Sequence, residues 1–363
     1  LTTPFCAWFE KSRMVSGEIQ LEDDMVELDG NKLIFRFPDV HPNAVCELEF
    51  QRTLRIPDDN QAYPLPPGLG RFALEHVEDH AAKLPLTWQQ HGGILLPMYQ
   101  SEALWINFNS RPVGTSEPYP FAVKIATGKI NAVTGEVWQN KLIKKPQDYV
   151  VVPEQPWLDG YCVQKGLIRQ FVAMPQGQGY TAEEQITGQA EHGGLQIIVY
   201  PMKRKYYEEL CLRNLMPING CYHSLFHCCL EPKHMELGLA PGGLMKQEIY
   251  EDPHRFHVWD KQLPSRCFVH ILNSEQWETV TGKPIPRKPP TAQQYTQAGL
   301  PWFDYYDDQS NALAGSSKLA SLDSVAAKTI KNGETPLADN STIKPAQVHH
   351  LSSQKQTVHD GQW

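Results

Sequence analysis

Two stretches of this chain, about a hundred residues apart, share a His-Gly-Gly tripeptide followed by an apolar run. They occupy residues 91–98 and 192–199. Paired glycines permit backbone angles that a side chain forbids, and a short run of leucine, isoleucine and valine is typical of a buried strand. We therefore predict that both runs enter a common hydrophobic interior as strands, each from a bend formed by glycines, which have no side chains. The repetition also raises the hypothesis of a duplicated half.

The surrounding pattern predicts an α+β fold that is rich in β-structure, with antiparallel or mixed sheets and peripheral helices. The chain has 29 prolines, which divide it into short elements. Residues 25–37 alternate on both sides of Asp29-Gly30-Asn31, which is a strong hairpin signal. Further strands are expected at residues 45–56, 104–108, 121–125, 149–152 and 167–173.

Three helices are expected beside these sheets. Residues 202–214 carry tyrosines and leucines at three- and four-residue spacing, which predicts a helix. Asn273 can cap a helix that starts near Ser274, and Thr291 with Gln294 resembles a capping box.

The chain is long enough for one large or two medium cores. We predict an N-terminal β module over residues 1–85, a central β-rich α+β domain over 86–309, and a polar tail over 310–363. The last segment is rich in serine, alanine, lysine, asparagine and glutamine. Such a composition buries little apolar surface, so an extended tail is expected.

Charge and cysteine usage limit the classes of function. A net charge of −8 argues against a general nucleic-acid or anionic-membrane binder. The apolar stretches are much shorter than the roughly 18 residues of a membrane span, so none is expected. The eight cysteines are scattered rather than grouped in a disulfide framework. Reduced thiols in a cytoplasmic protein are the favoured interpretation.

The two histidines of the repeated tripeptide, His91 and His192, are candidate site residues. In some α/β-hydrolases a His-Gly-Gly turn precedes the oxyanion-hole amides, but the Gly-X-Ser-X-Gly elbow that those enzymes need does not occur in this sequence. A turn with a capping or core histidine is therefore preferred. Glu183 could orient His192 for general-base work. Glu191 is expected to face away from His192, as neighbours in a strand do.

A second candidate site is the cysteine- and histidine-rich segment at residues 221–229. His223 and His227 would share one face of a helix, a spacing that can chelate zinc or iron, and His91 and His192 could join them. Buried thiols that pack as small hydrophobic groups are the favoured interpretation. We therefore expect no cofactor, with zinc or iron as the alternative.

Trp157 and Trp302 each stand close to aspartates in the sequence. If exposed, they would suit a sugar or protein surface, because tryptophan combines a large contact area with a polar handle. If buried, they belong to the core, which is the preferred interpretation.

Five segments, at residues 150–160, 166–175, 193–197, 239–253 and 291–306, resemble a family of predicted proteins from bacteria and fungi. One of them contains Pro156-Trp157-Leu158-Asp159-Gly160. The resemblance covers roughly residues 50–310. The family has no assigned activity, so the resemblance implies no catalytic residues.

The leading hypothesis is a non-catalytic binding or self-assembling protein of the cytoplasm, acting as a homo-oligomer or with a protein partner. One alternative is a metal-dependent hydrolase or oxidoreductase that uses the four histidines named above. Another is carbohydrate binding through Trp157 or Trp302.

Overall fold

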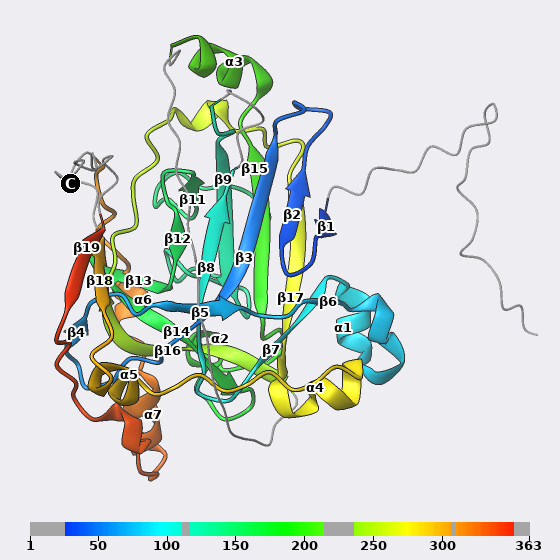
Figure 1. Cartoon of the computed structure of the whole chain (residues 1–363). Helices are drawn as coiled ribbons and strands as arrows, with labels where there is room; N and C mark the ends of the chain where they lie inside the picture. Colours follow the sequence, from blue (N-terminus) through cyan, green and yellow to red (C-terminus); the bar gives the residue numbers. More distant parts are fainter. Residues whose placement is uncertain (1–25, 111–116, 214–235, 306–309, 352–363) are drawn as a thin grey trace, which may run out of the picture.

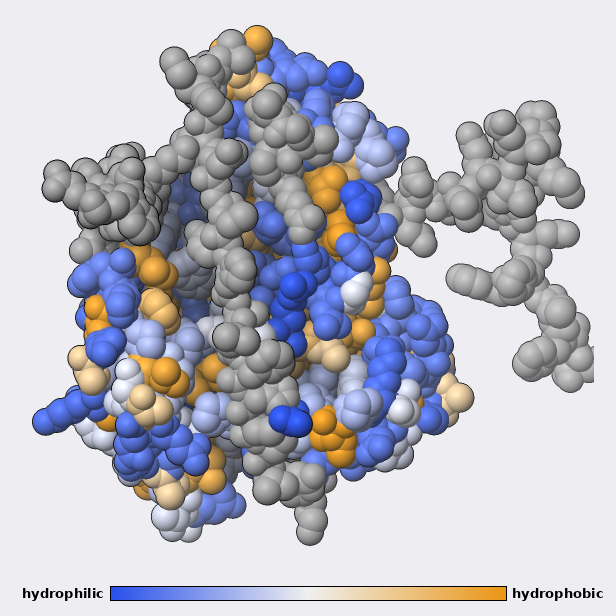
Figure 2. Space-filling view, in the orientation of Figure 1, coloured by the Kyte–Doolittle hydropathy of each residue, from blue (hydrophilic) through white to orange (hydrophobic). Residues whose placement is uncertain are grey.

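The computed structural model describes residues 26–110, 117–213, 236–305 and 310–351. The fold is rich in β-structure: one large, mainly antiparallel sheet, with a few helices around it. Figure 1 shows the long strands side by side, with α3 at the top and α4, α5 and α7 at the bottom. Hydrophilic residues predominate on the face seen in Figure 2, with apolar residues scattered among them.

One part of the sheet begins with the predicted hairpin, which is confirmed. Its strands β1 (Val26–Leu28) and β2 (Leu33–Arg36) pair antiparallel. Asp29 and Lys32 close the turn with two backbone hydrogen bonds, at 3.0 and 3.2 Å. The sheet then continues through β3 (Val45–Thr53) to β8 (Ala103–Asn109).

A second part is built around β17 (Ser265–Asn273). On one side β17 pairs antiparallel with β15 (Leu195–Pro201), which in turn pairs with β9 (Phe121–Thr127). On its other side β17 pairs in parallel with β7 (Ile94–Met98).

The long strands β14 (Leu167–Pro175) and β16 (Glu236–Lys246) join the two parts, because β14 pairs with β8 and with β16, and β16 pairs with β17. The sheet thus folds over one hydrophobic core. Phe37 of the first part lies 5.9 Å from Phe121 of the second, measured between ring centroids.

Shorter elements complete the described fold. The short strands are β4 (Ala62–Tyr63), β5 (Gly68–Arg71), β6 (Glu75–His76), β10 (Ile130–Asn131), β11 (Val150–Val152), β12 (Trp157–Leu158), β13 (Gly160–Gln164), β18 (Trp302–Tyr305) and β19 (Val348–Leu351). The helices are η1 (Glu78–Lys83), α1 (Leu86–His91), α2 (Ala182–Thr187), α3 (Arg204–Arg213), η2 (Phe256–Val258), α4 (Ser274–Thr281), α5 (Ala292–Gln297), α6 (Ser317–Ala320), α7 (Val325–Lys331) and η3 (Ala338–Asn340).

The predicted helix caps are present in the structure. The Asn273 side chain accepts a hydrogen bond from the Glu275 amide at the start of α4. Thr291 and Gln294 form the expected reciprocal capping box at the start of α5. Both caps satisfy amides that the helix itself leaves without partners.

Buried glutamines hold several loops to the strands in a way that the sequence did not suggest. Gln170 accepts from the Ile56 amide at 3.0 Å and donates to the Leu54 carbonyl at 2.9 Å. Gln155 does the same between Tyr250 and Trp157. A primary amide offers both a donor and an acceptor. One glutamine side chain can therefore bond an amide and a carbonyl of a loop, as a neighbouring strand would.

The extended tail is not confirmed, because residues 310–351 fold against the body. Leu319 is fully buried. The Leu313 amide donates to the Ile249 carbonyl at 2.7 Å, and the Ser316 hydroxyl donates to the Thr134 carbonyl at 2.7 Å. The predicted boundary at residue 85 lies between strands of one continuous sheet, since β3 pairs along its length with β8. Within the described residues no helix has the length and apolar character needed to cross a membrane.

Candidate functional site

Both His-Gly-Gly turns lead into buried strands, as predicted, and they meet at one residue of β17. Val269 is the register partner of Ile94 in β7 and of Leu195 in β15. From Val269, the strands β7 and β15 run in opposite directions along β17, because β7 is parallel to β17 and β15 is antiparallel to it. The two runs therefore enter one interior, and they run through it in opposite directions.

The glycines are required because each turn approaches the backbone of β17 closely. A Cβ on Gly93 would lie 2.1 Å from the Phe268 carbonyl oxygen. A Cβ on Gly194 would lie 2.3 Å from the Val269 carbonyl oxygen. Both glycines also have positive φ angles, of 90° and 52°, which side-chain-bearing residues rarely adopt.

The first turn ends helix α1. Gly92 is the C-cap residue, and its amide donates to the Trp88 carbonyl at 3.0 Å. The carbonyl of Gly92 lies 3.1 Å from Nε2 of His270. Burial lowers the pKa of His270 to about 3, so the ring is neutral near pH 7. A neutral ring can bond to a carbonyl only through a protonated nitrogen, so Nε2 carries the proton and donates it.

A cluster of rings lies beside this turn. Trp88 stacks on His270 at 4.6 Å between centroids, and His270 stacks on Phe268 at 4.4 Å. Phe268 stacks in turn on His91 at 4.7 Å, with only 4° between the ring planes. His91 also lies 6.0 Å from His270, and it is the exposed member of this cluster.

The second turn is held by a buried carboxylate. Glu183, in the first turn of α2, accepts hydrogen bonds from the amides of Glu191, His192 and Gly193 at 3.0, 2.9 and 2.8 Å. Glu183 therefore binds the backbone of the turn rather than serving as a hydrogen-bond partner of the His192 ring.

The expectation that Glu191 faces away from His192 was wrong. Nε2 of His192 lies 3.7 Å from Oε2 of Glu191. Residues 191–192 form a bend rather than a strand, so the alternation rule does not apply to them.

The structure brings His91 and His192 together at one end of the site, with their ring centroids 6.4 Å apart. Burial lowers the pKa of each imidazole, and the nearby Lys129 ammonium lowers both further. For His192, the carboxylates of Glu183 and Glu191 partly oppose this effect. Both rings are therefore predominantly neutral near pH 7.

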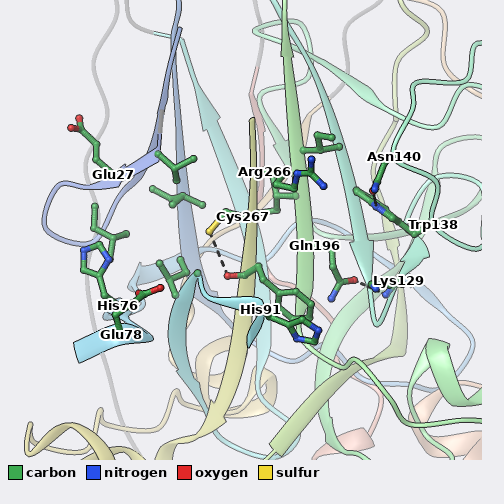
Figure 3. Close-up of a pocket in the computed structure, with 18 residues that line it drawn as sticks. Glu27, His76, Glu78, His91, Lys129, Trp138, Asn140, Gln196, Arg266 and Cys267 are labelled. Carbon is green, nitrogen blue, oxygen red and sulfur yellow. Dashed lines mark hydrogen bonds between the residues drawn. The ribbon is translucent and has the colours of Figure 1, made fainter. Parts of the chain in front are cut away.

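His91 and Lys129 border a groove of about 700 Å³ that runs between β1 and β17 and onto the outer face of β15. His192 lies beside His91 but does not line this groove. Figure 3 shows Glu27, His76 and Glu78 on one side, Lys129, Trp138 and Asn140 on the other, and His91 and Cys267 between them. The remaining lining residues are Val26, Leu28, Leu33, Gly93, Ile94, Gln196, Ile197, Ile198, Arg266 and Phe268.

Lys129 and Gln196 are fixed on the groove wall by the turn between β9 and β10. Lys129 has a positive φ of 57°, and its amide donates to the Gln196 side-chain oxygen. The nitrogen of the same Gln196 amide donates to the Gly193 carbonyl at 2.8 Å, which links this turn to the second His-Gly-Gly turn.

The groove offers aromatic edges, amides and cations, but its thiol is a poor nucleophile. Burial raises the pKa of Cys267 to about 12, so the thiol is protonated near pH 7. A protonated thiol is weakly reactive, because the thiolate is the nucleophile.

The two tryptophans singled out in the sequence lie away from this groove and differ in exposure. Trp302 is fully buried and its indole donates to Thr296 at 3.2 Å, so it cannot serve as a surface platform. Trp157 is half-buried, and its ring lies 4.8 Å from Tyr305 and 6.2 Å from Trp105.

The predicted metal ligands His223 and His227 lie outside the described residues. Among the residues that the structure does describe, no three or more histidine, cysteine or acidic side chains are arranged to hold a metal ion. In particular, His91, His192 and His270 form a cluster of rings rather than a chelating set.

Sequence reasoning missed His270, Phe268, Lys129 and Gln196. The alternation of Phe268 and His270 across Val269 places both rings on one face of a strand. That pattern alone cannot show which other segments that face meets. No protein-family model, curated protein or solved structure matches this chain.

Proposed function

We propose that this protein is a non-catalytic binding protein whose ligand occupies the groove between β1 and β17. The observation that carries the proposal is the groove itself, at about 700 Å³, within the usual range of ligand sites. Its lining supports binding, because aromatic and apolar side chains are combined with a few polar groups: the Gln196 amide, which is hydrogen-bonded at both ends, and the Lys129 and Arg266 side chains.

The chemistry of the lining favours binding over catalysis. The Cys267 thiol stays protonated near pH 7 because burial raises its pKa to about 12. Glu183, which the sequence suggested could orient His192 for general-base work, already accepts hydrogen bonds from three backbone amides. The metal-dependent alternative is tested by elemental analysis of untagged protein: stoichiometric zinc or iron would favour it over our proposal.

The binding proposal is tested by thermal-shift screening of the full chain against a library of metabolites and short peptides. We compare wild type with Lys129→Asn, because asparagine tolerates a positive φ and removes only the charge. The matched control is Lys165→Asn, which changes an exposed lysine in the β13–β14 turn. Stabilisation lost in Lys129→Asn and kept in Lys165→Asn supports the groove. Ligands that stabilise all three proteins equally would contradict it.

Self-association is a second candidate function, supported by strand β19. All four of its residues are exposed, and among the described strands it pairs only with β18. An exposed strand edge is a ready surface for pairing with another chain. We expect light scattering to give an oligomer for wild type and a smaller species for Val348→Lys/Leu351→Lys; a wild-type monomer would end this proposal.

A cytoplasmic location is supported by the described cysteines, all of which are free thiols: Cys46, Cys162, Cys211 and Cys267. Subcellular fractionation tests it. Recovery of the protein in a secreted fraction would contradict it.

A further inference from the structure

The groove is bordered by two strand edges that have no partner among the described strands. On the side away from β15, β17 pairs with β7 only from Val269 to Asn273. The preceding residues, Ser265 to Phe268, have no paired strand on that side in the described part of the chain. Strand β1 pairs with β2 along one edge, and its other edge likewise has no described strand partner.

These two edges line the same groove. Val26, Glu27 and Leu28 of β1 border it on one side, and Arg266, Cys267 and Phe268 of β17 border it on the other. Four residues of an extended chain span about 13 Å, since a strand rises about 3.3 Å per residue. The open edge of β17 is therefore long enough to pair with a short added strand. Because Cα atoms of β1 come within 8 Å of β17, and a strand between the two needs about 9–10 Å, the added strand must displace β1 outward.

The two faces of such a strand would meet different surroundings. Val26 and Leu28 pair with Phe35 and Leu33 of the core, so they mark the inward, apolar face. Arg266 is exposed on the outward face, and it forms no ion pair with any of the described residues. An added strand would thus place apolar side chains inward at alternate positions, and a residue outward beside Arg266.

We propose that the ligand of this groove is an extended segment of a partner polypeptide that adds to the edge of β17 as a short strand. Its inward positions are apolar, and an acidic residue faces Arg266. Opposite charges on directly paired residues stabilise a strand pair. Backbone pairing at an exposed sheet edge provides the affinity, and the alternate side chains provide the specificity. This inference rests on the proposed binding function of the groove.

The test uses the full chain and three fluorescein-labelled peptides. The first is Val-Glu-Val-Glu-Val, the second is Val-Lys-Val-Lys-Val, and the third is the first peptide with N-methylated valines. The protein variant is Arg266→Glu, and its matched control is Arg287→Glu, which reverses another exposed arginine. Affinities are measured by fluorescence anisotropy.

We expect saturable binding of the glutamate peptide to wild type and to Arg287→Glu. Arg266→Glu should bind it about tenfold more weakly and should bind the lysine peptide instead, because the cross-strand charges are exchanged. The N-methylated peptide should bind at least about tenfold more weakly, because it lacks donors along one edge.

Several results would overturn the inference. One is equal binding of the N-methylated peptide, which would mean that no backbone pairing occurs. Another is an equal effect of the two arginine variants, or no binding of any designed peptide at about 1 mM. Tighter binding of a synthetic peptide covering residues 14–25 would assign the groove to this chain's own sequence rather than to a partner. If Lys129-dependent metabolites still bind while all peptides fail, strand addition is wrong and the proposed function stands.

Discussion

The two His-Gly-Gly turns have the same sequence and lead into strands that pair with the same residue of β17, Val269, yet they are held in different ways. The first is the end of helix α1, and its Gly92 carbonyl accepts a hydrogen bond from buried His270. The second is a bend in which the amides of Glu191, His192 and Gly193 donate to the carboxylate of Glu183. A buried imidazole thus binds a carbonyl of the first turn, whereas a buried carboxylate binds amides of the second, whose Gly193 carbonyl is bonded by Gln196.

The comparison shows what the shared tripeptide is for. What both turns require is a glycine whose Cα lies against the backbone of β17, as Gly93 and Gly194 do. The histidines are not equivalent in their contacts: His91 stacks on Phe268, whereas His192 lies near Glu191. Similar sequence here reflects a similar packing constraint, and the rings are brought together at the groove as a consequence.

The largest expected effect comes from the glycines that touch β17. Gly93→Ala and Gly194→Ala should each destabilise the fold by about 3–5 kcal/mol, because an unfavourable positive φ adds to a backbone overlap. Gly188→Ala, at a helix end with open space around it, should cost only about 1–2 kcal/mol. Urea denaturation measures the differences, and equal losses at all three positions would refute the close approach.

Glu183→Gln should loosen the second turn and leave the first unchanged. The glutamine NH₂ group would oppose an amide donor, so we expect a loss of about 2–3 kcal/mol. Amide exchange should accelerate at residues 191–193 and stay unchanged at Gly92 and Gly93. The control Glu184→Gln, which alters the capping box of α2 and the hydrogen bond from the Gly179 amide, should cost about 1–2 kcal/mol. Faster exchange in both turns would show that they are one cooperative unit.

The first turn should also be the source of a pH dependence. Unfolded His270 takes up a proton as the pH falls through about 6.5, whereas folded His270 does so only near pH 3. The contribution of buried, neutral His270 to the free energy of unfolding is therefore fully present above pH 6.5. It is lost below that pH at about 1.4 kcal/mol per pH unit. His270→Leu should remove this part of the slope between pH 6 and 5. The exposed-site control His349→Leu should not, and an unchanged slope in His270→Leu would contradict the assignment.

A feature of the fold or of the site could be predicted from the sequence only where neighbouring residues cause it. The β1–β2 hairpin and the caps at Asn273 and Thr291 follow from neighbouring residues, and all three were predicted. The meeting of Ile94, Val269 and Leu195 depends on pairing between distant segments, so no short pattern contains it. The sequence also suggested that Glu183 orients the His192 ring. Spacing along the chain does not determine where a carboxylate points, and the Glu183 carboxylate in fact binds backbone amides.

The smallest effect concerns the charge shared by both turns. Lys129→Asn should raise the pKa of His91 and of His192, because the ammonium lowers both. The stability change should stay below about 0.5 kcal/mol, as for most surface substitutions. NMR titration of the imidazoles gives both values, with Lys165→Asn as the control. A shift at only one ring would mean that Lys129 does not lie between the two turns.

The central claim is that pairing on the groove side of β17 begins at Val269 and that the preceding edge has no partner among the described strands. Amide hydrogen exchange of the full chain without added peptide tests this directly, because paired amides are protected. We predict that alternate amides within Ser265–Phe268 exchange at least about tenfold faster than every amide from Val269 to Leu272. Uniform protection from Ser265 to Asn273 would show that the edge is already paired, and the groove would then not be an open binding site.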